Sequence, residues 1–322
     1  MDGFKAKLRS SSRIVTLIAL NSAIVVFMTI VKGEAFFSST NFEAILISMA
    51  CDLLLACGMT FVLILGGVDL SVGAIVAFSS VVVALLMRAG IPVPLSIVIT
   101  LIFCIATGFL NGLMVGLGNL APFVSTLGMQ TALRGMCYVL TLGYQVTGLP
   151  KSFLSIGQGK VLGIPGLVII SIVITVILGF LLPRLKVFKQ LYLVGTSKQT
   201  AFMSGIPVNK VIILGFALSG CLAGISGILM SSRYALGFAG FFVGAETRAI
   251  AAAVTGGAIM SGGEGSMFGT ALGILLVALV NNAFVMFNGR SEWQNAISGI
   301  ILIIALFVDV MRTRRALSKG WI

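Results

Sequence analysis

Runs of about twenty apolar residues recur along the chain, and they constrain its fold more than any other feature. The hydrocarbon core of a bilayer is crossed by roughly 20 residues of α-helix, so a run of this length can span it. No segment between the runs is long enough to form a soluble core of its own. We therefore predict one domain over residues 1–322, an all-α polytopic membrane protein with about ten transmembrane helices. The runs cover residues 14–31, 45–65, 72–87, 93–115, 121–142, 163–183, 211–231, 244–260, 266–288 and 295–311.

Lysine and arginine cluster at three places along the chain, and these clusters predict its orientation. Together they hold 13 of the 21 basic residues and fall before the first run, between the sixth and seventh, and after the tenth. Cytoplasmic loops carry an excess of basic residues, so we expect both termini in the cytoplasm, with tails at 1–13 and 312–322 and a loop at 184–210. The first run is long for a signal peptide and has no small-residue cleavage site after it, which favours an uncleaved helix.

The composition excludes several kinds of chemistry. Histidine is absent, so imidazole bases and histidine metal sites are impossible, and the five cysteines lie in apolar runs without CxxC spacing. The net charge of +12 is explained by the three basic clusters and does not indicate nucleic-acid binding. No GxxxxGK motif followed by Ser or Thr occurs, so a partner must bind any ATP that is used. We expect no catalytic residue, metal or cofactor in this chain.

Glycines spaced four residues apart lie inside several of the apolar runs. The sets are Gly108, Gly112 and Gly116, then Gly220 and Gly224, then Gly265, Gly269 and Gly273. This spacing lets helix backbones approach closely in lipid, where no hydrophobic force drives helix association. We interpret the sets as helix packing rather than as ligand sites.

Two glycine-rich turns join consecutive runs on the predicted cytoplasmic side. The first, within residues 58–73, contains two glycines followed by side-chain oxygens that could cap the next helix or contact a partner. The second, within residues 256–269, has a single acidic residue. The residues concerned are Gly66, Gly67, Asp69, Ser71 and Gly73 in the first turn, and Gly262, Gly263 and Glu264 in the second.

The loop at 184–210 mixes good helix formers with Gly205 and Pro207, which predicts a short helix followed by a sharp stop. A short, small-residue-rich helix with basic neighbours is suited to docking on another protein. A solvated connection is an equally good interpretation from these residues alone.

Five ordered motifs resemble the permease subunit of ribose-type ATP-binding cassette (ABC) importers, a family that carries simple sugars or the furanosyl signal autoinducer-2. They are GGVDLSVG (66–73), PFVSTLGM with Arg134 and Gly135 (122–135), SGIPV (204–208), SGCLAGISG (219–227) and AIAAAVTGGAIMSGGEGSMFGTALG (249–273). The resemblance covers residues 41–309.

This resemblance implies partners and a role for the loop. Residues 195–208 would be the coupling loop that presses on a cytoplasmic ABC ATPase, with Gly195, Thr196, Ala201, Ser204, Gly205, Ile206 and Pro207 as its coupling residues. The complex would hold two permease subunits, identical or not, and a periplasmic solute-binding protein would deliver the solute.

The chain departs from the family pattern at three places. The coupling loop usually reads GxNxxAA, whereas here Gln199 and Thr200 precede Ala201. The common EL-D before the AIAA motif is Glu246, Thr247 and Arg248, and an asparagine usual in the second run is Asp52. These departures leave the fold unaffected but leave the partner ATPase and the solute open.

Charged residues inside apolar runs are costly and indicate function. Asp52 and Arg134 lie at similar depths below the predicted outer surface, about 10 to 12 Å at 1.5 Å per residue. We hypothesise that they form a pair beside the translocation path; the alternative is that each separately reaches water or backbone carbonyls. Asn111 and Gln130 are further candidates for the path, because a sugar needs amide and hydroxyl partners.

The sequence therefore predicts the permease subunit of an ABC importer for a simple sugar or autoinducer-2 in the bacterial inner membrane, driven by a partner ATPase. A branched-chain amino acid permease remains an alternative, because that related family shares the glycine-rich turns. An ion-coupled secondary carrier is a third possibility, although only Asp52 resembles a coupling residue.

Overall fold

Almost every element of the protein is an α-helix, as expected for a chain that must satisfy its backbone polar groups within lipid. The computed structural model describes residues 2–289, the backbone only for 2–13, and isolated positions between 293 and 311. The predicted run at 295–311 is thus described only at isolated positions, and the tail at 312–322 lies outside the described residues. The elements are α1 (Asp2–Lys32), η1 (Gly33–Ala35), α2 (Ser39–Ile64), α3 (Val72–Arg88), α4 (Val93–Gly116), α5 (Pro122–Thr141), α6 (Lys151–Gln158), β1 (Lys160–Val161), β2 (Ile164–Pro165), α7 (Gly166–Leu181), α8 (Lys186–Thr196), α9 (Lys198–Met203), α10 (Val208–Tyr234), α11 (Ala245–Thr255) and α12 (Met267–Met286).

Several helices are long and apolar enough to cross a bilayer. In the described part of the chain, five meet this condition individually, and α7 with α8 makes a sixth candidate that is bent by 75°. The five lie at Ile14–Ala35, Ser39–Ile64, Val93–Gly116, Val208–Tyr234 and Met267–Met286. The outward faces of the bundle are apolar as well; Ile30 is 78% exposed and Val139 is 74% exposed. Such a surface fits lipid rather than water.

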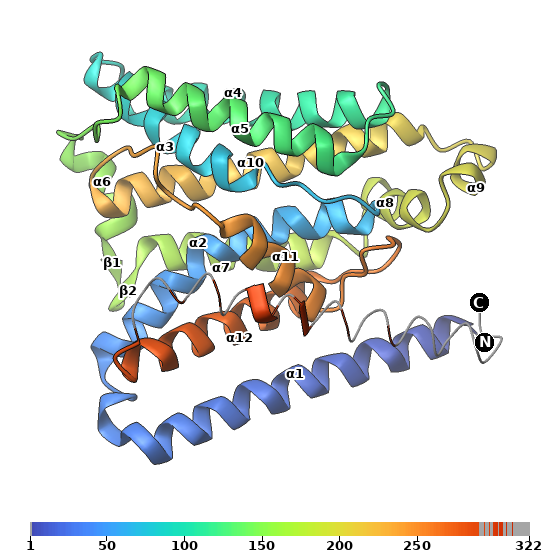
Figure 1. The fold of residues 1–322 in the computed structure, drawn as a ribbon, viewed down its shortest axis with the longest axis horizontal. Coiled ribbons are helices and arrows are strands. Elements are labelled where there is room, and N and C mark those ends of the chain that lie inside the picture. Colours follow the sequence, from blue (N-terminus) through green and yellow to red (C-terminus); the bar gives the residue numbers. More distant parts are fainter. Residues whose placement is uncertain are drawn as a thin grey trace.

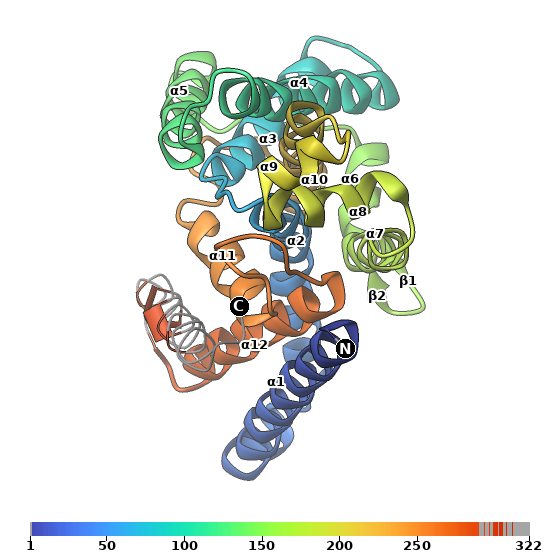
Figure 2. The ribbon, with the colours of Figure 1, turned by 90° about the vertical axis from the view of Figure 1, so that its right-hand side faces the viewer.

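Helix α2 lies at the centre of the bundle. Between Ala50 and Ile64, every residue except Asp52 is buried. Helix α10 packs on α2, α3 and α4, whereas α12 packs on α2, α11 and α1. Helix α1 lies at the edge of the bundle, on the side away from α4 and α5 (Figure 2). The core is therefore organised around α2 and α10.

The two ends of the bundle differ in structure. Helix α9 and the start of α1 lie at one end, on the right of Figure 1. Helix α6 and the β1–β2 hairpin lie at the opposite end. The two strands are antiparallel, with Lys160 opposite Pro165 and Val161 opposite Ile164.

Helices α4 and α10 meet at a seam of glycines. A Cβ atom added at Gly112 would lie 2.6 Å from Ile213 Cα, and one added at Gly220 would lie 2.5 Å from the Cys104 carbonyl oxygen. A Cβ at Gly108 would overlap the Phe216 carbonyl oxygen. The predicted packing role of these glycines is confirmed, because only residues without a side chain fit between the two backbones.

The predicted turn after the second run is present, whereas one predicted span ends early. Between α2 and α3, residues 65–71 are not helical, and Asp69 and Ser71 in this stretch are completely buried. The prediction of a helix over 244–260 is wrong in its extent, because α11 covers only Ala245–Thr255, about 16 Å at 1.5 Å per residue. Its helix ends before Gly257, whose φ of +103° is incompatible with a right-handed helix. Hydropathy could not detect this end, since the glycines and alanines beyond it are still apolar.

Candidate functional site

The two predicted glycine-rich turns meet the end of α8 at one junction. A Cβ added at Gly195 would overlap the Ile64 carbonyl oxygen at the end of α2 and would lie 2.7 Å from the Gly263 nitrogen. A Cβ at Gly262 would lie 2.7 Å from the Gly195 carbonyl oxygen and 2.9 Å from the Gly66 nitrogen. We call Gly66, Gly195, Gly262 and Gly263 the glycine junction. It connects the chain segment before α9 directly to the turns that follow α2 and α11.

Hydrogen bonds hold the glycine junction together. The Gly263 N–H donates to the Ile64 carbonyl at 2.8 Å. The Tyr192 hydroxyl on α8 donates to the Gly265 carbonyl, also at 2.8 Å. Gly262 and Gly263 have φ values of +88° and +84°, which a residue with a side chain rarely adopts. A displacement of α8 would therefore be transmitted to both turns.

The loop at 184–210, which includes the predicted coupling residues, contains two short helices, α8 and α9. The Ser197 hydroxyl accepts the Thr200 N–H at the start of α9, and Gly205, with φ of +76°, follows its end. Ala201 and Ile206 are buried against the core. Phe202 and Met203 between them are 74% and 77% exposed. Ser204 donates back to the Thr200 carbonyl at 2.9 Å, and Pro207 is the N-cap of α10.

A buried hydrogen-bond network holds the turn before α3. Asp69 Oδ1 accepts from the Ser71 hydroxyl at 2.6 Å and from its N–H at 3.0 Å, while Oδ2 accepts from Ser219 of α10 at 2.8 Å. The Asn111 amide of α4 donates to the Ser71 oxygen at 2.8 Å. The carboxylate therefore has three donors from the protein, and all four residues are completely buried.

This network corrects the prediction that Asp69 and Ser71 cap the following helix. Ser71 is the N-cap of α3, but its side chain accepts no hydrogen bond from the first turn. Instead, the side chains join the turn to α4 and α10. The same turn is tied to α5, because the Leu70 N–H donates to the Thr126 hydroxyl at 3.0 Å and Gly67 packs on Pro122.

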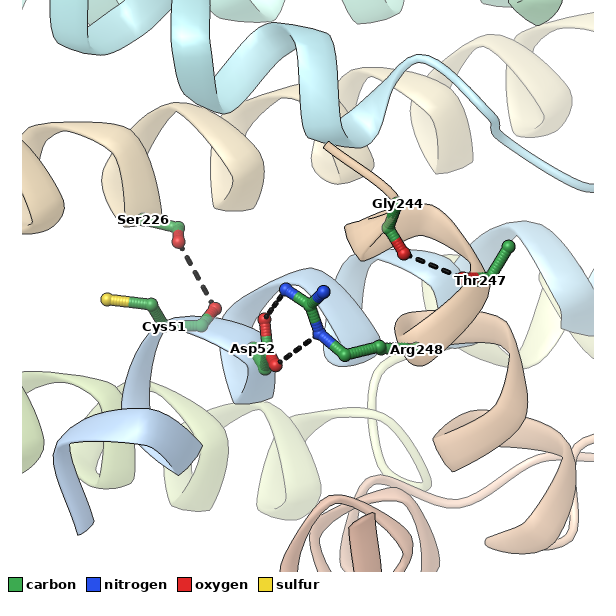
Figure 3. Close-up of polar contacts among 6 residues, drawn as sticks. All are labelled: Cys51, Asp52, Ser226, Gly244, Thr247 and Arg248. Atoms are coloured by element: carbon green, nitrogen blue, oxygen red, sulfur yellow. Dashed lines mark hydrogen bonds and ion pairs between the residues drawn. The ribbon is translucent and has the colours of Figure 1, made fainter. Parts of the chain in front are cut away.

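Charged residues meet where α11 lies against α2 (Figure 3). Arg248 Nε donates to Asp52 Oδ2 at 2.9 Å, and a terminal guanidinium nitrogen donates to Oδ1 at 3.2 Å. The two side chains are 16% and 13% exposed. Beside them, Thr247 donates to the Gly244 carbonyl at 2.6 Å and stabilises the turn that leads into α11.

A second polar contact joins α11 to α5. Gln130 donates to Glu246 Oε1 at 3.1 Å. The other oxygen of Glu246 packs on Gly73 of α3, where an added Cβ would lie 2.7 Å from it. Arg134 donates to the carbonyls of Ala239 and Phe241 at 2.5 and 2.7 Å, in the segment before α11.

The hypothesised Asp52–Arg134 pair is therefore wrong. Arg134 binds backbone carbonyls, as the alternative stated, and Asp52 binds Arg248 instead. Similar depth along two helices does not decide which side chains face each other, and here α11 rather than α5 presents its arginine to Asp52.

A known protein family matches most of the chain. The family described as "Branched-chain amino acid transport system / permease component" matches residues 41–306. The chain belongs to this permease family. It is a multi-pass protein of the inner membrane.

Three relatives of this permease are transport proteins for sugars by name. The ribose import permease protein of Bacillus subtilis is 35% identical over 288 residues, 89% of each chain. The D-allose transport system permease protein of Escherichia coli is 33% identical over 86% of this chain and 85% of its own. The L-arabinose ABC transporter permease protein of Azospirillum brasilense is 34% identical over 88% and 84%, respectively. No solved structure matches the chain.

The residues predicted for the permease site fall into three groups rather than one. Gly195 and Thr196 join Gly66, Gly262 and Gly263 at the glycine junction. Asn111 joins the Asp69 network, and Gln130, Arg134 and Asp52 all bind residues on or before α11. Glu264 lies in the turn that follows α11, and the backbone carbonyl of Glu264 accepts the Ile259 N–H at 3.4 Å.

Sequence reasoning missed Arg248 and Ser219 as partners, and it missed the exposed pair Phe202 and Met203. Arg248 carried a usable signal, because an arginine in an apolar run needs an acidic or carbonyl partner. Ser219 carried none, since a serine in a membrane helix is ordinarily a packing residue.

Proposed function

We propose that this permease imports a simple sugar, of the ribose type or autoinducer-2, as one subunit of an ABC importer. The observation that carries the proposal is the similarity to ribose, allose and arabinose permeases over most of each chain. The amide, carboxylate and guanidinium groups next to α11 suit a solute that hydrogen-bonds through hydroxyl groups.

We further propose ten crossings with both termini in the cytoplasm. The basic clusters at 5–13 and 184–210 support this orientation, as does the position of α9 and the start of α1 at one end of the bundle (Figure 1). In this arrangement, α6 and the β1–β2 hairpin face the periplasm and meet a solute-binding protein.

A partner ATPase that binds α9 supplies the energy for import. Phe202 and Met203 are the exposed apolar residues of this helix, with Lys198 near its start, and they suit an apolar groove with an acidic rim. ATP binding in the partner moves α9, and the glycine junction transmits that movement to the turns after α2 and α11. These turns connect directly to the half-buried polar residues of the path.

A second permease subunit, identical or different, completes the path. Helix α5 supports this proposal, because Thr131 is exposed on a helix that also carries Gln130 and Arg134. A helix with such polar residues is better placed against a water-filled path or another subunit than against lipid.

Two experiments test these proposals separately. The solute class is tested by uptake of radiolabelled ribose into vesicles that contain the complete importer, with excess unlabelled ribose, allose, arabinose or leucine as competitor. We expect the sugars to reduce uptake at least tenfold and leucine to leave it unchanged. Absence of saturable ribose uptake together with saturable uptake of radiolabelled leucine would instead favour the branched-chain amino acid class, which the description of the family names.

The ATPase contact is tested by co-purification. We expect Phe202→Asp with Met203→Asp to abolish recovery of the ATPase with the permease. The matched control is Phe37→Asp, an exposed phenylalanine just before α2, whose start lies at the end of the bundle opposite α9 (Figure 1). Full recovery with the α9 variant would contradict the proposed contact.

A further inference from the structure

We propose that the Asp52–Arg248 ion pair is a latch, which holds the short helix α11 against α2 and opens once in every transport cycle. This inference rests on the proposed import function and adds to it a named moving element and the contact that restrains it.

Helix α11 is separated from its neighbours along the chain by glycines. Gly244 precedes it with φ of +78°, and Gly257 follows it with φ of +103°. Residues 235–244 before it contain no α-helix, so neither end continues into a long helix. An element of eleven residues with such ends can move relative to α2 and α5 through small backbone changes, but only together with α12, because a Cβ added at Gly273 of α12 would overlap the Ala252 carbonyl oxygen.

Polar side chains attach α11 to α2 and α5, whereas close backbone contacts attach it to α12. The ion pair ties it to α2 through two hydrogen bonds, and Gln130 ties Glu246 to α5. The charged groups around the pair are Glu246 on α11 itself and Arg134 on α5, so the region holds two acidic and two basic side chains. Balanced charge lets the pair separate without leaving a net charge in the membrane interior.

The geometry of the pair suits a contact that opens. A bidentate guanidinium–carboxylate contact is directional, so a small displacement of α11 removes both hydrogen bonds together. The side chains keep 16% and 13% exposure, which gives water or a hydroxylated solute access to them. Asp52 is also the one residue from Ala50 to Ile64 on α2 that is not buried.

A reversible covalent bridge tests the latch. In the assembled importer, with the five native cysteines replaced by alanine, we combine Asp52→Cys with Arg248→Cys and join the thiols with a bifunctional methanethiosulfonate reagent. Opening of the latch predicts that ATP-dependent sugar uptake falls below a tenth of its value and returns on reduction. A purely structural tie predicts unchanged uptake, because the bridge replaces one tie by another; unchanged uptake would overturn the latch.

The control bridges Lys32→Cys and Phe287→Cys, which replace the contact of the Lys32 ammonium with the Phe287 ring, 4.4 Å away, between α1 and the residue after α12. We expect its uptake to be unaffected by the reagent. A second variant, Asp52→Arg with Arg248→Asp, re-forms the pair in the opposite sense, and we expect at least a third of native uptake. Loss of uptake in the exchanged variant with a folded complex would also contradict the latch. Absence of ATP-dependent sugar uptake by the native importer would instead contradict the proposed function.

Discussion

Helices α4 and α10 are held together by backbone contacts, whereas charged and amide side chains join α11 to α2 and α5. At the α4–α10 seam, glycines bring one backbone against the other, so the distance between the helices is fixed by hard contact. At α11, an ion pair and an amide–carboxylate hydrogen bond cross the space to α2 and α5. A close backbone contact has no alternative partner, whereas a hydrogen-bonded side chain can exchange one partner for another.

This difference assigns different tasks to the two regions. Close-packed interiors transmit displacement and resist it, since any change of distance is costly. Hydrogen-bonded charges stabilise one arrangement strongly and lose that stabilisation over a short movement. We infer that α4 and α10 form the fixed frame and that α11 changes position relative to α2 and α5, together with α12, on which its backbone packs closely at Gly273.

The largest expected effect concerns the ion pair. Arg248→Gln leaves Asp52 mostly buried and without its cation, which we expect to cost about 3–5 kcal/mol of stability. The double variant Asp52→Asn with Arg248→Gln should recover most of this loss, because no charge remains unpaired. Thermal unfolding of the purified complex, followed by size-exclusion chromatography, measures both. A double variant no more stable than the single one would show that the two side chains do not interact.

The α4–α10 seam should also lose stability when it is altered, but no second substitution should restore it. Gly108→Ala places a methyl group against the Phe216 carbonyl oxygen, and we expect a loss of about 2–3 kcal/mol by overpacking. Changing the Phe216 side chain cannot relieve this clash, because the contact is with backbone. The matched control is Gly135→Ala on α5, where an added Cβ has no atom within 4 Å. Equal stability of the two variants in the same unfolding assay would contradict the account of the seam.

The Asp69 network should lose less stability than either the ion pair or the seam. Asp69→Asn replaces one accepting oxygen by an NH₂ group facing the Ser219 hydroxyl, so we expect a loss of about 1–2 kcal/mol. Ser219→Ala should cost less, about 1 kcal/mol, since the carboxylate keeps both bonds from Ser71. A larger loss for Ser219→Ala than for Asp69→Asn would contradict the account in which the Asp69 carboxylate is the central acceptor of the network.

The smallest effect is expected at the exposed pair of Glu43 and Lys160. Their side chains are 26% and 49% exposed, and ion pairs of this kind contribute up to about 1 kcal/mol. Glu43→Gln should therefore shift stability by less than about 1 kcal/mol, measured in low salt, where surface pairs are strongest. A loss as large as that of Arg248→Gln would remove the distinction between a latch and an ordinary ion pair.

The helices of this permease were largely predictable from its apolar runs. The predicted runs at 45–65, 93–115 and 266–288 match α2, α4 and α12 within a few residues, apart from the earlier start of α2. These helices are long, and hydropathy reports length directly. The extent of α11 was not predictable in this way, because the glycines after Thr255 change backbone direction without changing hydropathy.

The site was predictable in part, residue by residue. The turns around Gly66 and Gly262 were identified from glycine content, but their contact with Gly195 depends on the packing of three distant segments. The partner of Asp52 was missed for the same reason. Sequence gives the depth of a residue along a helix, whereas a pair also requires that two helices face each other.

The most direct test of the central claim, that a separate ATPase drives solute through this chain, is sugar uptake with and without that partner. The permease and the solute-binding protein are reconstituted in vesicles, with or without the ATPase, and radiolabelled ribose uptake is measured with ATP on the ATPase side. We predict uptake only when both ATP and the ATPase are present. Equal uptake without the ATPase, or uptake driven by an ion gradient alone, would contradict the account.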